Sequence, residues 1–257
     1  MTSRRAILIA APLVLLTAAM SLAGPERTDQ LALRGRRQTL HLYGQPRGAP
    51  IILSSGDGGW IHLGPQVAEM LAARGFFVVG VDSRAYLESF TSATSALTPG
   101  DVAGDFRTLI GYASRATGQQ PLLVGISEGA ALSVLAAADP SPPAPAGVIA
   151  IGLGDRNELA WRWKDAVIYL THGVPSEPTF SVLALADRIA PAPLAVIASA
   201  HDEYVPEAEV DRIMAVARAP KRLWMIDAAD HRFSDRQEEL ARCLAEAVAW
   251  VRQNDTR

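Results

Sequence analysis

The chain has 257 residues, of which 49% are hydrophobic, and 24 basic side chains nearly balance 27 acidic ones. This composition is typical of a folded globular protein and excludes a disordered chain. The small acidic excess argues against a protein that binds nucleic acid by charge and against a polybasic membrane anchor. The length fits one large domain, because α/β domains commonly reach roughly 200–250 residues around a single core.

Residues 1–23 have the features of a cleavable signal peptide. Two arginines precede an uncharged apolar run, and the small residues Ser21 and Ala23 mark a cleavage site. We therefore expect export to the periplasm and a single domain at residues 24–257. The alternative is an uncleaved helix that anchors the protein in the inner membrane, facing the periplasm. The arginine pair leaves general and twin-arginine export both open.

The remaining chain alternates short apolar runs with helical patterns. This rhythm indicates the α/β class, with a mainly parallel sheet and helices on both faces. We expect strands at residues 38–42, 51–53, 76–81, 122–124, 148–151, 194–198 and 222–226. We expect helices at residues 65–73, 99–117, 128–138, 206–217 and 234–253, the last with Ser234 as its N-cap.

Residues 155–191 interrupt this rhythm, because they are too many for a simple connection between a helix and a strand. The segment carries several large side chains: Trp161, Trp163, Tyr169, His172 and Phe180. We expect an insertion, which forms either a lid over the site or a hairpin and helix that only pack against the sheet.

A Gly-x-Ser-x-Gly pattern lies between an expected strand and an expected helix. It reads Gly125-Ile126-Ser127-Glu128-Gly129. In that context the pattern is typical of a nucleophile elbow, a sharp turn that holds the serine outward and needs small residues around it. We predict that Ser127 is a catalytic nucleophile. The alternative is a structural turn, because the short pattern is common by chance.

A serine needs a base to take its proton, and the base needs an acid to fix its tautomer. Asp202 and then His231 follow the ends of two expected strands, where the sites of parallel sheets form. We predict Asp202 as the acid and His231 as the base, and we interpret His201 as a loop histidine. Two neighbouring carboxylates compete for the role of the acid: Glu203 and Asp230. Asp230 has capping of the last helix as its alternative role.

Ester cleavage also needs main-chain N–H groups that bind the oxyanion of the intermediate. We expect one from Glu128, which follows the nucleophile, and one from Asp57 in the glycine-rich run 54–60. The glycines permit a close approach of the backbone. A phosphate-binding loop is the competing interpretation, but no Gly-Lys-Ser/Thr follows.

No pattern predicts a cofactor or a metal. Gly152-Leu153-Gly154 lacks the third glycine of a dinucleotide-binding fingerprint, and the five histidines form no His-x-x-x-His pair. Cys243, the single cysteine, lies in a helical apolar pattern, which predicts a buried and inert side chain.

Several motifs occur in a fixed order along the chain. They are Ser55-Gly56-Asp57-Gly58-Gly59-Trp60, then Val78-Val79-Gly80-Val81-Asp82-Ser83 with Tyr86, then Thr98-Pro99 before Asp105, then the elbow. Together they resemble the VirJ/AcvB-type bacterial virulence proteins, which are exported members of the α/β-hydrolase superfamily. The resemblance covers roughly residues 51–131, and the segments around Asp202 and His231 more loosely.

The resemblance implies hydrolysis of aminoacyl-phosphatidylglycerol at the periplasmic face of the inner membrane. It implies Ser127, Asp202 and His231 as the triad and residues 56–60 as the oxyanion element. Around them we expect these substrate-binding residues: Gly56, Gly58, Trp60, Asp82 and Tyr86. The chain departs from the family at Glu128, where the family tends to have phenylalanine.

We therefore expect a periplasmic serine hydrolase that acts on a small-molecule or lipid ester, with contact to lipid headgroups and without nucleic acid or cofactor. Four carboxylates are candidates for contact with an aminoacyl ammonium group, and loop solvation or helix capping is their alternative role: Asp57, Asp82, Glu128 and Glu203. The other candidate functions are a general carboxylesterase or lipase and a non-catalytic periplasmic protein linked to virulence or secretion. The order of the three triad residues favours an enzyme. The oligomeric state stays open.

Overall fold

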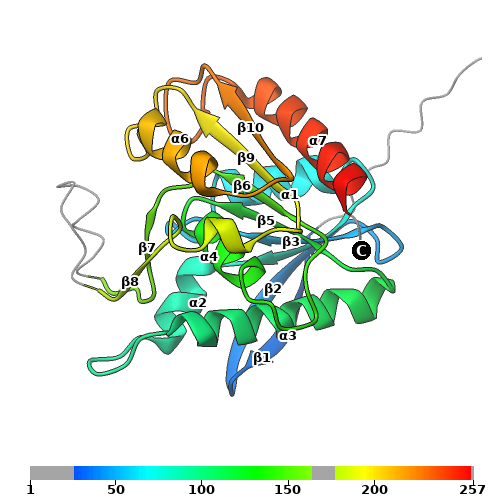
Figure 1. Cartoon of the computed structure of the whole chain (residues 1–257). Coiled ribbons are helices and arrows are strands. Elements are labelled where there is room, and N and C mark those ends of the chain that lie inside the picture. The colour runs from blue at the N-terminus through cyan, green and yellow to red at the C-terminus, as the bar shows by residue number, and fades with distance from the viewer. Residues whose placement is uncertain (1–25, 164–176, 256–257) are drawn as a thin grey trace, which may run out of the picture.

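The structure, a computed structural model, describes residues 26–163 and 177–255. Its main element is an eight-stranded sheet in the order β1-β2-β4-β3-β5-β6-β9-β10 (Figure 1). The strands are β1 Arg27–Leu33, β2 Arg36–Tyr43, β3 Pro50–Ser54, β4 Phe77–Val81, β5 Leu122–Ile126, β6 Val148–Ile151, β9 Leu194–Ser199 and β10 Lys221–Ile226. The pairs β1-β2 and β2-β4 are antiparallel, and the other neighbours are parallel.

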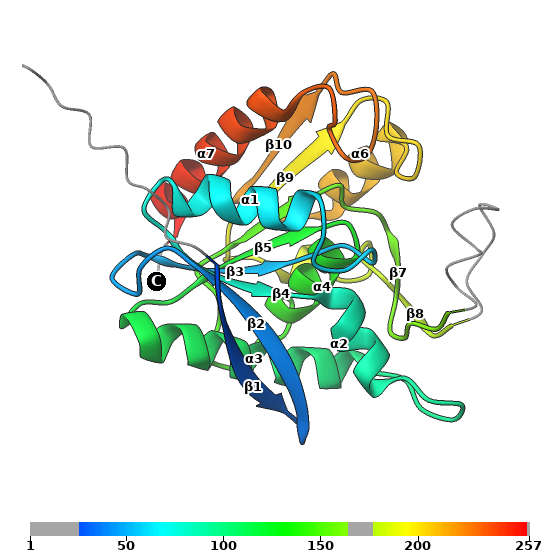
Figure 2. The ribbon, with the colours of Figure 1, turned by 180° about the vertical axis from the view of Figure 1, so that it is seen from behind.

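The central strands are apolar on both faces because helices cover both faces. Every residue of β3, β4, β5, β6 and β9 is buried, as expected for parallel strands inside an α/β domain. The helices α1 (Leu63–Ala72) and α7 (Gln237–Asn254) pack on one face (Figure 2).

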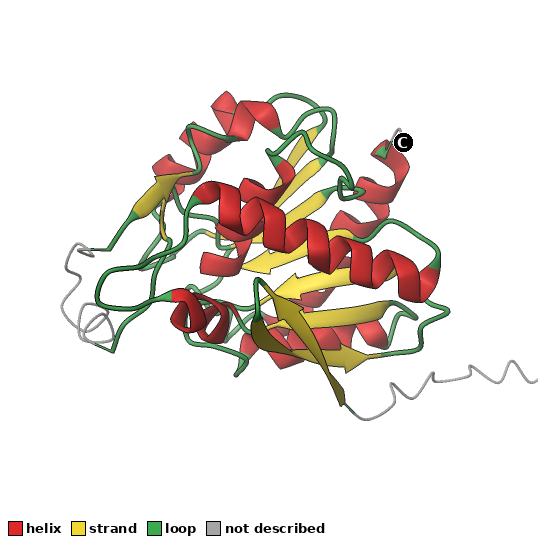
Figure 3. Ribbon diagram, turned by 90° about the horizontal axis from the view of Figure 1, so that it is seen from below, coloured by secondary structure: helices red, strands yellow, loops and turns green. Residues whose placement is uncertain are grey.

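Within residues 26–163 and 177–255, the other face carries four α-helices, and the strands run between these two helical layers (Figure 3). They are α2 Ser83–Phe90, α3 Pro99–Thr117, α4 Glu128–Ala137 and α6 Glu207–Val216. The expected α/β class is therefore confirmed, and every strand and helix expected from the sequence occurs close to its predicted position.

One predicted helix boundary is wrong. The helix α7 begins at Gln237 and has Arg236, not Ser234, as its N-cap. Ser234 instead donates its hydroxyl and its N–H to the carboxylate of Asp230. The physical reason is that the turn after His231 uses the serine locally, so that the helix starts one turn later.

The described part of the insertion forms a second, two-stranded sheet. It pairs β7 (Arg156–Glu158) with β8 (Thr179–Ser181) antiparallel, and the short helix η1 (Ala186–Arg188) follows. Several of its side chains join the core on the face of α3 and α4: Leu159, Trp161, Phe180, Val182, Ala186 and Ile189. Tyr169 and His172 lie outside the described residues, and the lid stays a prediction.

The remaining fold predictions concern Cys243 and the leader. Cys243 is buried, with 3% of its surface exposed, which confirms the packing role expected from its helical pattern. In residues 26–163 and 177–255, no helix combines the length and the apolar character needed to cross a membrane. The predicted signal peptide at residues 1–23 lies outside these ranges.

Candidate active site

Ser127 occupies a sharp turn between β5 and α4. Its backbone has φ 52° and ψ −118°, a conformation that is rare outside glycine and clusters at functional sites. A Cβ on Gly125 would lie 2.2 Å from the carbonyl oxygen of Gly129, and a Cβ on Gly129 would lie 2.3 Å from that of Ser55. Both glycines of the Gly-x-Ser-x-Gly pattern are therefore required by the packing of α4 against the ends of β3 and β5.

Asp202 and His231 form a short and largely buried hydrogen bond. The distance from Asp202 Oδ2 to His231 Nδ1 is 2.6 Å, and the two side chains are 2% and 12% exposed. Asp202 Oδ1 also accepts the main-chain N–H groups of Tyr204 and Val205, at 2.9 and 2.8 Å. Burial alone would raise the pKa of Asp202, but these hydrogen bonds outweigh it and hold the pKa below its ordinary value. The carboxylate therefore stays ionised while it orients the ring.

The imidazole of His231 lies against the segment that holds Ser127. The N–H of Ser127 donates to the carbonyl of Ile151 at 2.8 Å. The next residue, Gly152, packs on the imidazole so closely that a Cβ there would lie 2.6 Å from its Cε1. The predicted acid and base are therefore in direct contact, and the loop that carries Gly152 lies between the His231 ring and the turn that holds Ser127, at the carboxyl ends of β5, β9 and β10.

The competing carboxylates make different contacts. Asp230 accepts the N–H groups of Arg232 and Ser234, each at 3.0 Å. Glu203 accepts the main-chain N–H of His231 at 2.8 Å. Asp202 therefore contacts the imidazole of His231, whereas Asp230 and Glu203 bind main-chain N–H groups of the loop beside it.

The glycine-rich loop after β3 also reaches the serine. A Cβ on Gly56 would lie 3.4 Å from the Cβ of Ser127, so the two backbones approach closely. Within the part of the chain that the structure describes, the main-chain N–H groups of Asp57 and Glu128 have no hydrogen-bond acceptor. Both predicted oxyanion donors therefore flank the serine with their N–H groups available.

Two of the residues expected to bind substrate have structural roles. Tyr86 is buried at 1% exposure, and its hydroxyl donates to Asp105 at 2.7 Å. Asp105 also pairs with Arg34 at 2.8 Å. The prediction for Tyr86 is wrong, because its hydroxyl is committed inside the core. Asp82 caps α2 by accepting the N–H of Ala85 at 2.9 Å, which is the alternative role that the sequence left open.

The other expected substrate-binding residues lie on the glycine-rich loop. Gly56 faces the serine, and Gly58 is exposed. The indole of Trp60 packs over Gly80 in the sheet. This packing places the half-buried ring against β4, and its contact with the substrate stays a prediction.

Glu128 supplies more than its predicted main-chain group. Its side chain is buried at 8% exposure, and Oε1 accepts the N–H of Glu158 in β7 at 3.0 Å. Burial, followed by the charges of Glu158 and Asp57, raises the pKa of Glu128 well above its ordinary value. Both the raised pKa and the hydrogen bond from Glu158 weaken Glu128 as a partner for an ammonium group. The link to β7 carried no sequence signal.

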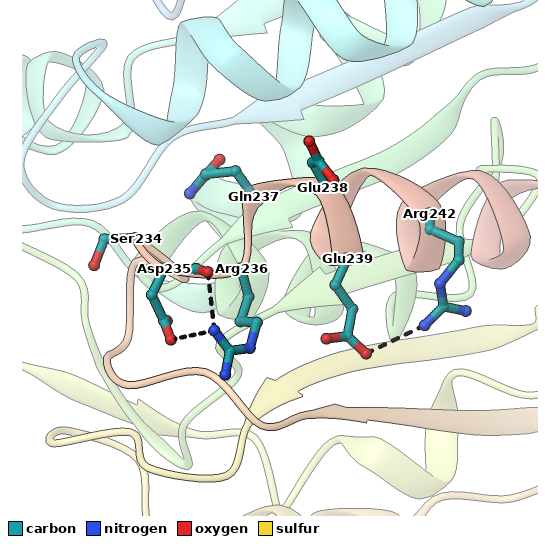
Figure 4. A pocket seen from close by; sticks show the side chains of 7 residues that line it. All are labelled: Ser234, Asp235, Arg236, Gln237, Glu238, Glu239 and Arg242. Carbon is teal, nitrogen blue, oxygen red and sulfur yellow. Dashed lines mark hydrogen bonds and ion pairs between the residues drawn. The ribbon is translucent and has the colours of Figure 1, made fainter.

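A surface hollow of about 650 Å³ opens elsewhere, at the start of α7 (Figure 4). It is lined by Ser234, Asp235, Arg236, Gln237, Glu238, Glu239 and Arg242. Its arginines pair with its own carboxylates, Arg236 with Asp235 and Arg242 with Glu239. The predicted catalytic residues do not line it. Among the described residues, no group of three His, Cys, Asp or Glu side chains is arranged to hold a metal ion.

Comparison with known families supports the resemblance stated from the sequence. Residues 49–146 match the profile of the family described as "Bacterial virulence protein (VirJ)". The match contains both the glycine-rich loop and the elbow, so over this segment the chain is VirJ-like. A search of curated protein sequences gave no match.

Solved structures with the same architecture are α/β hydrolases. The esterase domain of a Rhodothermus marinus protein has 19% identity and a TM-score of 0.62, with 90% of this chain and 99% of that one covered. A dienelactone hydrolase from Anabaena variabilis has 17% identity and a TM-score of 0.61, with 88% and 97% covered. A membrane phospholipase A, described as a bacterial virulence factor, has 14% identity and a TM-score of 0.64, with 88% and 87% covered. These likenesses show the α/β-hydrolase fold.

Proposed function

We propose that this protein is a serine hydrolase that cleaves carboxylic esters through Ser127, His231 and Asp202. The observation that carries the proposal is the buried 2.6 Å hydrogen bond from Asp202 Oδ2 to His231 Nδ1. Because Nδ1 is engaged by the acid, the opposite ring nitrogen, Nε2, is the one free to take a proton from a serine. The strained backbone of Ser127 supports this role, and so does the contact of the His231 ring with Gly152, which follows the residue that accepts the Ser127 N–H.

The reaction follows from these positions. His231 Nε2 takes the proton of the Ser127 hydroxyl as Oγ forms a bond to the ester carbonyl carbon. The N–H groups of Asp57 and Glu128 donate to the oxyanion that develops. His231 then gives the proton to the leaving alcohol, and an acyl-enzyme remains. Water, activated by the same histidine, releases the acid and restores the serine.

The finer proposal is that the ester is an aminoacyl-phosphatidylglycerol, cleaved at the periplasmic side of the membrane. The VirJ match over residues 49–146 supports it. Asp57 supports it too, because its half-buried carboxylate lies on the loop beside the serine and accepts no hydrogen bond from the described residues. A carboxylate at that position attracts the aminoacyl ammonium group.

Labelling with a fluorophosphonate tests the hydrolase directly. The purified wild-type protein is expected to react at Ser127, and Ser127→Ala is expected to remain unlabelled. A chromogenic ester gives the matching turnover. A folded wild-type protein that neither reacts nor turns over the ester would contradict the proposal and favour the non-catalytic alternative.

The substrate is tested with Asp57→Asn, which keeps the main-chain donor and removes the charge. Turnover of aminoacyl-phosphatidylglycerol in mixed micelles is expected to fall about tenfold to a hundredfold, because a hydrogen bond to a charged group is worth roughly 1.5–3 kcal/mol. Turnover of a neutral ester is expected to persist. Asp211→Asn, an exposed change in α6, controls for the loss of one negative charge. Equal losses on both substrates would favour the general esterase.

The proposed location has its own test. N-terminal sequencing of protein released by osmotic shock is expected to begin at Gly24, after the predicted cleavage site. Recovery in the membrane fraction alone, with the leader attached, would favour the anchored alternative.

A further inference from the structure

Trp60 ends the glycine-rich loop, and the proposed chemistry does not use its side chain. The indole stacks on the imidazole of His41 in β2, with ring centroids 4.7 Å apart and planes 10° apart. Its Nε1 donates to the hydroxyl of Tyr43 at 3.4 Å. The ring also packs at the margin of the core between α1 and the sheet. Trp60 is therefore held by β2, two strands away from the strand that leads into its own loop.

The strand between them has a glycine where the indole lies. A Cβ on Gly80 of β4 would lie 2.1, 2.4 and 2.8 Å from the indole atoms Cη2, Cζ2 and Cζ3. Such distances are far inside van der Waals contact, so a side chain at position 80 and an indole at position 60 cannot both keep these positions. Gly80 and Trp60 belong to two separate motifs of the sequence, and the structure shows that they fit one another.

The loop between β3 and Trp60 has few other restraints. At its start, Ser55 donates its N–H to the carbonyl of Val81 at 3.0 Å, and its Oγ accepts the N–H of Ser83 at 3.1 Å. Inside the loop, the N–H of Gly59 donates to the carbonyl of Gly56 at 3.1 Å. The three glycines of the loop carry high backbone freedom. The conformation at Asp57 therefore depends on a firm anchor at each end.

We propose that Trp60, seated on Gly80, is the positioning residue that aims the main-chain N–H of Asp57 at the oxyanion. Trp60 acts through the loop and touches no reacting atom. The inference rests on the proposed ester hydrolysis, because the oxyanion is formed in that reaction. It assigns a role to the Trp60 side chain that neither substrate contact nor general core packing supplies.

This role has a kinetic signature. An oxyanion donor acts in the transition state, so a misplaced donor lowers kcat and leaves KM nearly unchanged. Removal of one donor reduces kcat by roughly 10²–10³ in enzymes of this kind. A displaced donor retains part of its effect, so smaller losses are expected here.

The test is a double-mutant cycle on kcat for a neutral chromogenic ester. Gly80→Ala is expected to lower kcat about 10- to 100-fold, with KM within about twofold, because the methyl group displaces the indole. Trp60→Phe is expected to lower kcat about 3- to 10-fold. The combined variant is expected to match Trp60→Phe alone, because a phenyl ring stops short of the indole atoms that meet the new methyl group. Losses that multiply, or a folded Gly80→Ala with unchanged kcat, would overturn the inference.

Gly147→Ala is the matched control for a crowded glycine. Its Cβ would lie 2.4 Å from Val251 Cγ1, at the amino end of β6 and away from the site. It is expected to lower the Tm and to leave kcat within about twofold. If Gly80→Ala does not fold, Trp60→Phe and Trp60→Leu provide the test. The two variants are expected to lower kcat in a graded way at constant KM. A rise of KM at constant kcat would overturn the inference.

Turnover of the neutral ester by the wild-type protein separates the proposed hydrolase function from the proposed role of Trp60. A wild-type protein without ester turnover would remove the proposed function. A wild-type protein with turnover, alongside folded Trp60 and Gly80 variants of equal kcat, would remove the role of Trp60 alone.

Discussion

Two histidine–aspartate pairs follow neighbouring strands of the sheet. His231 contacts Asp202, with 2.6 Å between ring nitrogen and carboxylate oxygen, and His201 contacts Asp227 at 2.9 Å. The first pair has side chains that are 12% and 2% exposed. The second pair has side chains that are 66% and 78% exposed. The two pairs thus share their chemistry and nearly share their distance, but they differ in burial.

The difference shows how firmly each pair holds its imidazole ring. Water screens the exposed pair, and a surface ion pair of this kind is worth about 0–1 kcal/mol. Asp202 is fixed by the N–H groups of Tyr204 and Val205, and its histidine rests on Gly152. Burial and these further contacts hold the His231 ring in one orientation, which a base needs.

The largest effect is expected from the nucleophile and the base. Ser127→Ala and His231→Ala are each expected to lower kcat/KM for a chromogenic ester by about 10⁴-fold or more, because the members of a triad act as one unit. The double variant is expected to be little worse than either single one. Initial rates with purified, folded protein provide the measurement.

His201→Ala tests the other side of the comparison. Its imidazole is exposed and pairs with an exposed carboxylate, so kcat/KM is expected to stay within about twofold. A collapse of turnover in His201→Ala with persistence in His231→Ala would reverse the assignment of the base.

The acid is expected to have the next largest effect. Asp202→Asn keeps the shape but favours the wrong tautomer of His231, and we expect kcat to fall about 10³- to 10⁴-fold. Asp227→Asn and Asp230→Asn are expected to stay within about threefold, because Asp227 pairs with His201 at the surface and Asp230 binds main-chain N–H groups. The measurement is the steady-state kcat of the three variants. A large loss of kcat in Asp230→Asn together with an active Asp202→Asn would assign the acid to Asp230.

The sequence predicts a candidate site where chemistry and topology leave few choices. Ser127 needed a glycine on each side, and the order serine, acid, histidine followed from the positions of the strands. The parallel central strands were predictable for a related reason, since strands buried on both faces are continuously apolar.

The misses share a different physical cause. The edge strand β1 pairs with β2 and is mostly exposed, so its apolar residues are confined to its last three positions. The helix α2 has only eight residues, too few for a clear helical period. The packing of Trp60 on Gly80 and the hydrogen bond from the Glu158 N–H to Glu128 join residues that are distant in the sequence. Such contacts depend on packing in three dimensions, which composition and spacing do not encode.

The smallest effect on activity is expected from Glu128→Gln, which extends the comparison to a buried carboxyl beside other acids. Burial and the charges of Glu158 and Asp57 raise the pKa of Glu128, so the folded protein holds a proton that the unfolded chain releases near the ordinary value of 4.5. Unfolding therefore releases a proton above pH 4.5, and stability falls as the pH rises from there to the raised pKa, by at most about 1.4 kcal/mol per pH unit.

Glutamine matches the neutral carboxyl and does not titrate. The Tm of Glu128→Gln, measured by calorimetry, is thus expected to increase relative to the Tm of the wild type as the pH rises. Its kcat on a neutral ester is expected to stay within about twofold. The exposed change Glu207→Gln in α6 is the control, and its Tm is expected to run parallel to that of the wild type. A constant Tm difference between Glu128→Gln and the wild type across this range would mean that Glu128 is ionised in the folded protein, and the buried carboxylate would return as a candidate for binding an ammonium group.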